Sequence, residues 1–309
     1  MGEVWRARHR LLARDSAIKL IRPGVLLGVA GKDAALIRRR FEQEARVTAA
    51  LRSPHTVELY DFGVSQDGGF YYVMELLDGI DLETLVKQFG PQPPARVVEI
   101  LRQVCQSLAE AHRAGLVHRD IKPTNIFVCR LGIRYDFAKV LDFGLVKTTP
   151  TEGETRMTRE GVTTGTPAYM APEVAMSSDK IDGRADLYGL GCVAYWLLTG
   201  SLLFDKRSAV AMVMAHMQEA PVPPSQKTEL PIPASLDRVV MACLAKKPED
   251  RPSTAEALAR MLEECKDVGA WTQDDAEKWW LTNQPGFVTK RADDTQPGDS
   301  VSAAALPTM

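Results

Sequence analysis

The sequence has no excess charge of one sign, few cysteines and no long uninterrupted hydrophobic run. Its 309 residues contain 38 Lys and Arg against 40 Asp and Glu, so the formal net charge is −2. A nearly neutral chain has no overall excess of positive charge that would point to nucleic acid, and we expect no nucleic-acid partner. The five cysteines form no Cys-x-x-Cys pair and have no histidine at metal-ligand spacing. We therefore expect reduced thiols in a cytosolic setting.

The longest run with little charge, residues 187–204, is long enough to be considered as a membrane span. Gly189, Gly191 and Gly200 interrupt this run, and no large positive cluster beside it would orient a span. The run is therefore predicted to form a helix buried at the centre of a globular lobe. No signal peptide precedes the predicted fold, so the prediction is a cytoplasmic protein without a membrane segment.

With 45% apolar residues, the chain is long enough to bury a large core in one domain or two lobes. Its first part has the pattern of strands with one helix, and long amphipathic helices follow. We predict an α+β protein with a small β-rich lobe over 1–77 and a large helical lobe over 78–265. A Trp-rich helical extension packed on the large lobe is predicted over 266–285, and a disordered tail over 286–309.

Turn signals and periodicity set the elements expected within the lobes. Asp67-Gly68-Gly69 predicts a hairpin turn, and Ser53-Pro54 ends the first helix. The connection from Cys129 to Phe137 is expected to be only a surface loop. The predicted strands cover 3–8, 16–21, 57–62 and 70–76. The predicted helices cover 34–51, 82–89, 94–114, 185–199, 207–218, 236–244, 254–265 and a short segment that starts at Thr272 or Gln273.

Two short motifs carry most of the chemical information. Residues 117–125 (Val-His-Arg-Asp-Ile-Lys-Pro-Thr-Asn) place an acid, a lysine and an amide on one loop, and residues 139–144 (Lys-Val-Leu-Asp-Phe-Gly) place an acid after an apolar strand. Phosphoryl transfer needs a carboxylate for the hydroxyl proton, a cation beside the moving phosphoryl group and two oxygen-bearing side chains that hold Mg²⁺. In this order, the motifs resemble the catalytic and metal-binding loops of the protein kinase superfamily.

The resemblance covers residues 1–265, and the segment Thr-Gly-Thr-Pro-Ala-Tyr-Met-Ala-Pro-Glu at 164–173 is similar to that of bacterial eukaryotic-like serine/threonine kinases. It implies a two-lobed protein kinase fold and an enzyme that transfers the ATP γ-phosphoryl group to Ser or Thr hydroxyls of proteins. The implied cofactors are ATP and Mg²⁺, for which Mn²⁺ could substitute. The resemblance also allows self-association for trans-autophosphorylation.

The same resemblance implies roles for three residues around the transferred group. Asp120 would accept the hydroxyl proton or orient the hydroxyl, and Lys122 would neutralise charge on the phosphoryl group. A lysine at this position accompanies Ser/Thr specificity in the family. Thr166 would contact both of these side chains.

The metal ligands and the phosphate-binding lysine are implied in the same way. Asn125 and Asp142 resemble the Mg²⁺ ligands, since both offer hard oxygen donors. Lys19 would contact the nucleotide phosphates and pair with an inward-facing glutamate on the following helix. Glu44 is the favoured partner and Glu42 the competing one. A broken Lys19–Glu44 pair would mark an inactive conformation.

The implied nucleotide-binding residues lie in both lobes. They are Gly2 and Lys19 beside the phosphates, Val4, Ala17 and Phe127 around the adenine, Met74 as gatekeeper, and Glu75 and Leu77, whose backbone groups would face the adenine edge.

Residues 142–173 resemble an activation segment. We favour Thr163 or Thr164 as an activating phosphorylation site, because Arg119 precedes the catalytic acid and its guanidinium could pair with a phosphate. A merely polar, Thr-rich loop is the alternative. The resemblance also implies two structural contacts: Asp186 would brace the catalytic loop, and Arg251 would pair with Glu173.

The resemblance is incomplete at the start of the chain. Of the family pattern Gly-x-Gly-x-x-Gly-x-Val, only Gly2-Glu3-Val4 is present, so residues 5–8 are expected to form an exposed sheet edge. We expect a misplaced start or a truncation. The alternative function is a nucleotide-weak scaffold, or pseudokinase. A small-molecule phosphotransferase is disfavoured by Ala171-Pro172-Glu173 and by Arg251.

Overall fold

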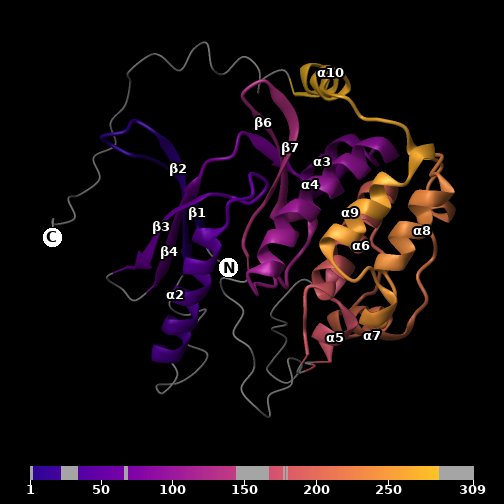
Figure 1. Cartoon of the computed structure of the whole chain (residues 1–309), viewed down its shortest axis with the longest axis horizontal. Helices are drawn as coiled ribbons and strands as arrows, with labels where there is room; N and C mark the ends of the chain where they lie inside the picture. The colour runs from indigo at the N-terminus through magenta and orange to yellow at the C-terminus, as the bar shows by residue number, and fades with distance from the viewer. Residues whose placement is uncertain are drawn as a thin grey trace.

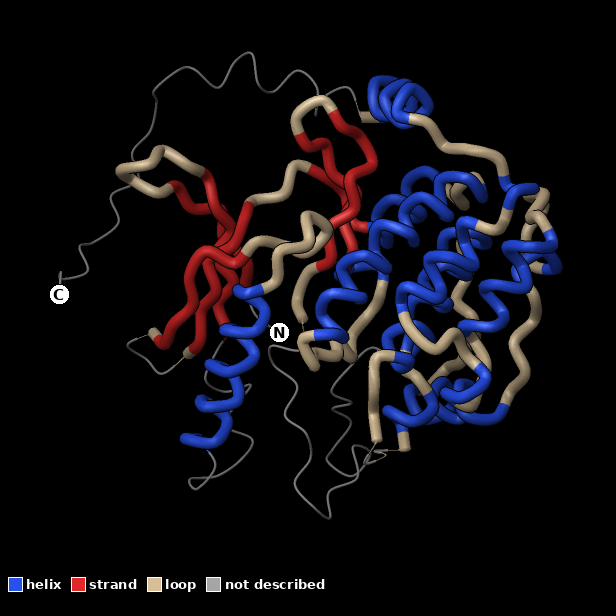
Figure 2. Tube along the Cα trace, in the orientation of Figure 1, coloured by secondary structure: helices blue, strands red, loops and turns tan. Residues whose placement is uncertain are grey.

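The structure is a computed structural model that describes residues 3–21, 34–65, 69–143, 167–176, 178 and 180–284. A strand-rich lobe and a helical lobe lie side by side, and the chain passes from the first to the second after β4 (Figures 1 and 2). This arrangement confirms the predicted α+β class. The predicted boundaries of the two lobes, of the Trp-rich extension and of the tail stay a prediction.

The small lobe is one antiparallel sheet with a helix packed against it. Its strands are β1 (Glu3–Arg8), β2 (Asp15–Ile21), β3 (Leu59–Val64) and β4 (Phe70–Glu75), in the order β1-β2-β4-β3, and its helix is α2 (Ala34–Ala50). Alternate residues of β4 are buried, as expected for a strand with one covered face. Ala45 of α2 completes a buried cluster with Ile21, Phe70 and Tyr72.

Within the described residues, β1 is an end strand of this sheet. Val4 and Trp5 on it are 62% and 58% exposed, which confirms the expectation of an exposed edge.

A second sheet lies between the small sheet and the helices (Figure 1). It is antiparallel, with the order β5 (Gly79–Asp81), β6 (Ile126–Leu131) and β7 (Arg134–Val140). The expectation of a surface loop between Cys129 and Phe137 is wrong. This segment continues β6 and β7 as a hairpin, and Tyr135, Asp136 and Phe137 are buried, because other parts of the large lobe cover them.

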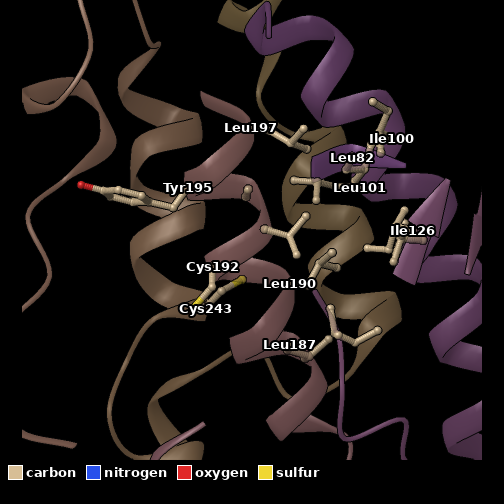
Figure 3. Close-up of a cluster of buried hydrophobic side chains, with 14 of the residues drawn as sticks. Leu82, Ile100, Leu101, Ile126, Leu187, Leu190, Cys192, Tyr195, Leu197 and Cys243 are labelled. Atoms are coloured by element: carbon tan, nitrogen blue, oxygen red, sulfur yellow. The ribbon is translucent and has the colours of Figure 1, made fainter. Parts of the chain in front are cut away.

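The large lobe contains one extended hydrophobic core. Figure 3 shows side chains such as Leu101 of α4, Leu190 of α6 and Ile126 of β6 within it. Side-chain N-caps set the starts of several helices, among them α3 at Asp81. The helices are α3 (Leu82–Phe89), α4 (Pro94–Arg113), α5 (Pro172–Ala175), α6 (Arg184–Thr199), α7 (Ala209–Gln218), α8 (Ala234–Cys243), α9 (Ala255–Glu263) and α10 (Gln273–Asn283).

The run considered above as a membrane span forms most of α6 at the centre of the large lobe. Its glycines allow close packing: a Cβ atom on Gly191 would lie 2.7 Å from the Cβ atom of Cys243, and one on Gly189 would lie 3.0 Å from the Ile121 carbonyl oxygen. No helix among the described residues is both long enough and apolar enough to span a membrane. The prediction of a buried helix is therefore confirmed.

The Trp-rich segment forms α10, which begins after Thr272 in a capping box with Asp275. Trp280 is completely buried. The five cysteines are all free and buried.

Candidate active site

Asp186 on α6 holds the backbone of the loop that follows α4. Its carboxylate accepts hydrogen bonds from the backbone N–H groups of His118 and Arg119, at 2.8 and 2.7 Å, and from the ring of His112 at 2.8 Å. Arg119 has φ 61°, a left-handed conformation that a non-glycine residue adopts only where its surroundings hold it. The predicted bracing role of Asp186 is therefore confirmed.

The acid, the lysine and the amide of this loop meet at one point. The Lys122 ammonium lies 2.9 Å from the Asp120 Oδ2 atom. The Asn125 amide donates to the Asp120 carbonyl at 2.9 Å and to its Oδ2 atom at 3.2 Å. A short 3₁₀ turn, Pro123–Asn125, brings the amide back toward the carboxylate. The Asp120 carboxylate is thus held between two hydrogen-bond donors while 20% of the side chain stays exposed.

Asp142 is joined to this loop through its neighbour. The Leu141 N–H donates to the Asn125 carbonyl at 2.9 Å, which extends the β6–β7 pairing up to the predicted metal ligands. The His118 ring donates from Nε2 to the Leu141 carbonyl at 2.7 Å, and its Nδ1 atom accepts from the Asp120 N–H at 3.2 Å. His118 thus links both motifs. The sequence analysis missed this role, although the histidine lies within the motif.

Lys19 reaches Asp142 across the gap between the lobes, with 2.5 Å between Nζ and Oδ2. Tyr72 lies opposite Lys19 in the β2–β4 register, and so on the same face of the sheet. Burial raises the pKa of the Tyr72 hydroxyl, and the negative charges of Glu44 and Asp142 raise it further. This buried tyrosine therefore lies near the predicted phosphate-binding lysine and within the electrostatic influence of Glu44 and Asp142, and the sequence analysis did not single it out.

The predicted ion pair between Lys19 and Glu44 differs from the pair that the structure contains. Among the described residues, the ion-pair partner of Lys19 is Asp142. Glu44 lies half-buried on α2 next to Ala45, on the helix face that meets the sheet. The catalytic role of Glu44 stays a prediction.

One residue predicted beside the adenine, Ala17, and the predicted gatekeeper, Met74, come together in the small lobe. Ala17 and Met74 are register partners, each 6% exposed, and pack with Val57. Val4 lies on β1 opposite Lys19 and is largely exposed, and Phe127 lies half-buried on β6 in the other sheet.

The strand connection predicted to face the adenine edge is held by an ion pair whose side chains are 9% and 16% exposed. The Glu75 carboxylate lies 2.5 Å from Lys139 Nζ and accepts from the Glu58 N–H at 2.8 Å. The side chain of Glu75 is therefore engaged within the protein. No hydrogen bond between described residues uses the backbone of Leu77. The sequence analysis included Lys139 only as part of a motif and missed its pairing with Glu75. The signal that could have identified this role is a lysine within an otherwise apolar strand.

The predicted contact of Arg251 with Glu173 is confirmed. The guanidinium binds the carboxylate through two hydrogen bonds of 2.7 and 2.8 Å, and both side chains are buried. This pair ties α5 to the segment before α9. Beside it, a pocket opens next to the catalytic loop; its lining includes Asp120, Ile121, Tyr169, Met170 and Val174.

Several predicted residues lie outside the described residues, namely Gly2, Thr163, Thr164 and Thr166. Their roles stay predictions.

The oxygen donors near Asp142 suit a hard cation. Among the described residues, no group of three or more His, Cys, Asp or Glu side chains could hold a metal ion by itself. Asn125 and Asp142 would therefore supply two oxygen ligands and leave the remaining positions to phosphate oxygens and water, as Mg²⁺ sites with nucleotides commonly do.

The chain was compared with known proteins. A family model described as "Protein kinase domain" matches residues 1–262. Serine/threonine-protein kinase pkn3 of Myxococcus xanthus is 38% identical over 265 residues, which cover 85% of this chain and 47% of the relative. Serine/threonine-protein kinase PknH of Mycobacterium bovis is 36% identical and covers 100% of this chain and 48% of the relative. PknB of Mycobacterium leprae, also a serine/threonine-protein kinase, is 39% identical, with coverages of 82% and 39%.

The chain thus spans less than half the length of these three relatives. A crystal structure of Rad53 in complex with AMP-PNP matches with a TM-score of 0.66 and 24% identity, over 84% of this chain and 61% of that one. At this identity the structural likeness shows the fold.

Proposed function

The chain belongs to the protein kinase domain family, and on that basis we propose that it transfers the ATP γ-phosphoryl group to Ser and Thr hydroxyls of proteins. The observation that carries the proposal is the meeting of Asp120, Lys122 and Asn125 on one loop, with Asp142 joined to that loop and to Lys19. Such prior placement of charged groups is the main means by which phosphoryl transfer is catalysed.

Each group has a distinct part in the proposed reaction. Asp120 orients the acceptor hydroxyl and takes its proton, and the Lys122 ammonium, 2.9 Å away, stabilises negative charge on the transferred group. Lys19 contacts the nucleotide phosphates. Asn125 and Asp142 would hold Mg²⁺, which supplies charge neutralisation when bound. The AMP-PNP in the Rad53 structure supports nucleotide binding.

Protein hydroxyls are favoured as acceptors by two features. The pocket beside Asp120 is bordered by Tyr169 and Met170, just before the buried Glu173–Arg251 contact. The matched relatives are named serine/threonine-protein kinases. The comparisons give no support to a pseudokinase scaffold. The proposal includes autophosphorylation at Thr163 or Thr164, which would pass between two copies of the chain.

The test is intact-mass spectrometry of the purified chain after incubation with ATP and Mg²⁺. We expect added phosphate masses that peptide mapping places at Thr163 or Thr164, and a rate per molecule that rises with protein concentration. Asp120→Asn should lower the rate by about 10²- to 10⁴-fold, the usual contribution of a general base. Asp142→Asn should abolish the added mass. A native chain that binds MgATP but never gains phosphate or phosphorylates a Ser/Thr peptide would refute the kinase proposal and favour the scaffold.

A further inference from the structure

The extension with α10 closes over a buried ion pair of the large lobe. Arg96 of α4 binds Asp136 of β7 through hydrogen bonds of 2.8 and 2.7 Å, and the two side chains are 0% and 1% exposed. Breaking such a pair on one side leaves a buried charge without compensation. The positions of Arg96 and Asp136 relative to each other are therefore tightly constrained.

Two tryptophans of the extension complete the coordination of this carboxylate. The indole N–H groups of Trp271 and Trp280 donate to the two oxygens of Asp136, each at 2.8 Å. The Trp279 ring lies 3.8 Å from the Arg96 guanidinium carbon, at cation–π distance. Residues from 271 onward therefore interact with both members of the ion pair.

The extension also holds the backbone of β7. The Gln273 side chain accepts from the Tyr135 N–H at 3.0 Å and donates to the Tyr135 carbonyl at 3.2 Å. The next residue, Asp136, has φ 51°, a left-handed conformation. Gln273, Trp271 and Trp280 thus fix two consecutive residues near the turn of the β6–β7 hairpin.

The opposite end of the same hairpin carries the predicted metal ligands. β6 begins at Ile126, directly after Asn125, and pairs with Val140 of β7, two residues before Asp142. The Leu141–Asn125 hydrogen bond continues this pairing beyond the strands. About six residues, or roughly 20 Å of extended chain, separate Asp136 from Asp142.

We propose that Asp136 is a positioning residue, and that residues 271–283 act as a clamp that sets the spacing of Asn125 and Asp142 through the β6–β7 hairpin. This inference rests on the proposed function, in which these two residues hold the metal. The clamp lies beyond residue 262, where the family match ends. It touches neither substrate nor metal, and acts only by fixing the strands.

The main test compares Trp280→Phe with Trp196→Phe in the full chain. Trp280→Phe keeps an aromatic ring but removes an N–H donor to Asp136. The control removes the Trp196 N–H, which donates to the Leu82 carbonyl in the same lobe and not to the hairpin. Hydrogen exchange of residues 126–142 and the Mg²⁺ concentration for half-maximal ATP binding are measured on both variants.

We expect Trp280→Phe to speed amide exchange along β7 by about tenfold, on the scale of one lost hydrogen bond to a charged group. The half-saturating Mg²⁺ concentration should rise several-fold, while ATP binding in EDTA stays unchanged. The control should leave both values as in the native chain. A lowered melting temperature with unchanged Mg²⁺ dependence and hairpin exchange would overturn the proposal, because the cluster would then only anchor α10.

A second variant covers the case in which Trp280→Phe does not fold. Gln273 is exposed, so Gln273→Ala removes only the contact with Tyr135 and should give the same changes at smaller size. Failure of the metal-binding part of the proposed function has a different signature, namely a native chain without Mg²⁺-dependent ATP binding. Faster exchange near Asn125 in the variants would still uphold the mechanical coupling in that case. Normal ATP binding with no such exchange effect would refute the clamp.

Discussion

The two lobes differ in the most deeply buried ion pairs that their described residues form. The large lobe has exposed pairs on its surface, such as Lys87–Glu83, but it also buries two pairs almost completely: the exposed fractions are 0% and 1% for Arg96–Asp136, and 0% and 7% for Arg251–Glu173. In the small lobe, Arg6 and Asp15 form a pair with 66% and 34% of their side chains exposed. The Lys19–Asp142 pair, which joins the lobes, is intermediate at 20% and 29%.

The hydrophobic core of the large lobe is also much more extensive than that of the small lobe. One large cluster of buried residues runs through the helical lobe, whereas the helix and sheet of the small lobe share a cluster of Ile21, Ala45, Phe70 and Tyr72. Asp120, Lys122 and Asn125, which are proposed for catalysis, therefore lie in the large lobe, whose extended core leaves little freedom for them to move. The lobe that supplies Lys19 rests on a much smaller core.

The largest stability effect is expected where a buried pair of the large lobe is broken. Arg251→Met leaves the Glu173 carboxylate buried without its partner and should lower the free energy of unfolding by about 3–5 kcal/mol. Urea denaturation followed by circular dichroism measures this loss. The double variant Glu173→Leu with Arg251→Met removes both charges and should recover most of the stability. A double variant as unstable as the single one would contradict the explanation.

Core truncation should show the same contrast between the lobes. Leu187→Ala, at a site that is 0% exposed within the large cluster, should cost about 4 kcal/mol. Ile21→Ala should cost about 2 kcal/mol, because the thin sheet can collapse around the lost side chain. Paired urea titrations measure the difference. Equal losses would show that both cores resist relaxation to the same degree.

Acid should destabilise the large lobe through His216. Burial lowers the pKa of His216 to about 4, and the nearby Lys246 ammonium contributes to this shift. The unfolded chain therefore takes up this proton near pH 6.5 and the folded chain only near pH 4. Stability is fully present above pH 6.5, and on the order of 3 kcal/mol is lost as the pH falls through this window.

The measurement is the free energy of unfolding between pH 7 and pH 4. His216→Gln should flatten this dependence, since the glutamine has no proton to gain. If the variant lost stability with falling pH as steeply as the native chain, the acid sensitivity would come from other groups.

The smallest effect is expected at the exposed pair of the small lobe. Asp15→Asn removes the 2.7 Å contact with Arg6 and should change stability by less than about 0.5 kcal/mol. A thermal melt at low and high salt measures it. A loss as large as that of Arg251→Met would remove the contrast between the lobes.

Local patterns in the sequence predicted most elements closely. The helix at 82–89 has the predicted limits, and the Thr272 cap starts α10 as expected. The third strand is displaced: it was predicted over 57–62 and runs over Leu59–Val64. The Val57 N–H instead donates to the Val140 carbonyl in the other sheet. A pairing between residues 83 positions apart (140 − 57) leaves no trace in local periodicity.

The sequence by itself determined the strands of the small sheet, the long helices and the order of the phosphoryl-transfer motifs, because each depends on neighbouring residues, whereas the hairpin of β6 and β7 became clear only in the structure. The tertiary structure alone decided that Lys19 meets Asp142, that Lys139 holds Glu75, and that α10 covers Arg96. These contacts join residues far apart in the chain, whose proximity depends on how the sheets and helices pack. A charged side chain inside the protein is stable only where an oppositely charged partner compensates for its loss of water.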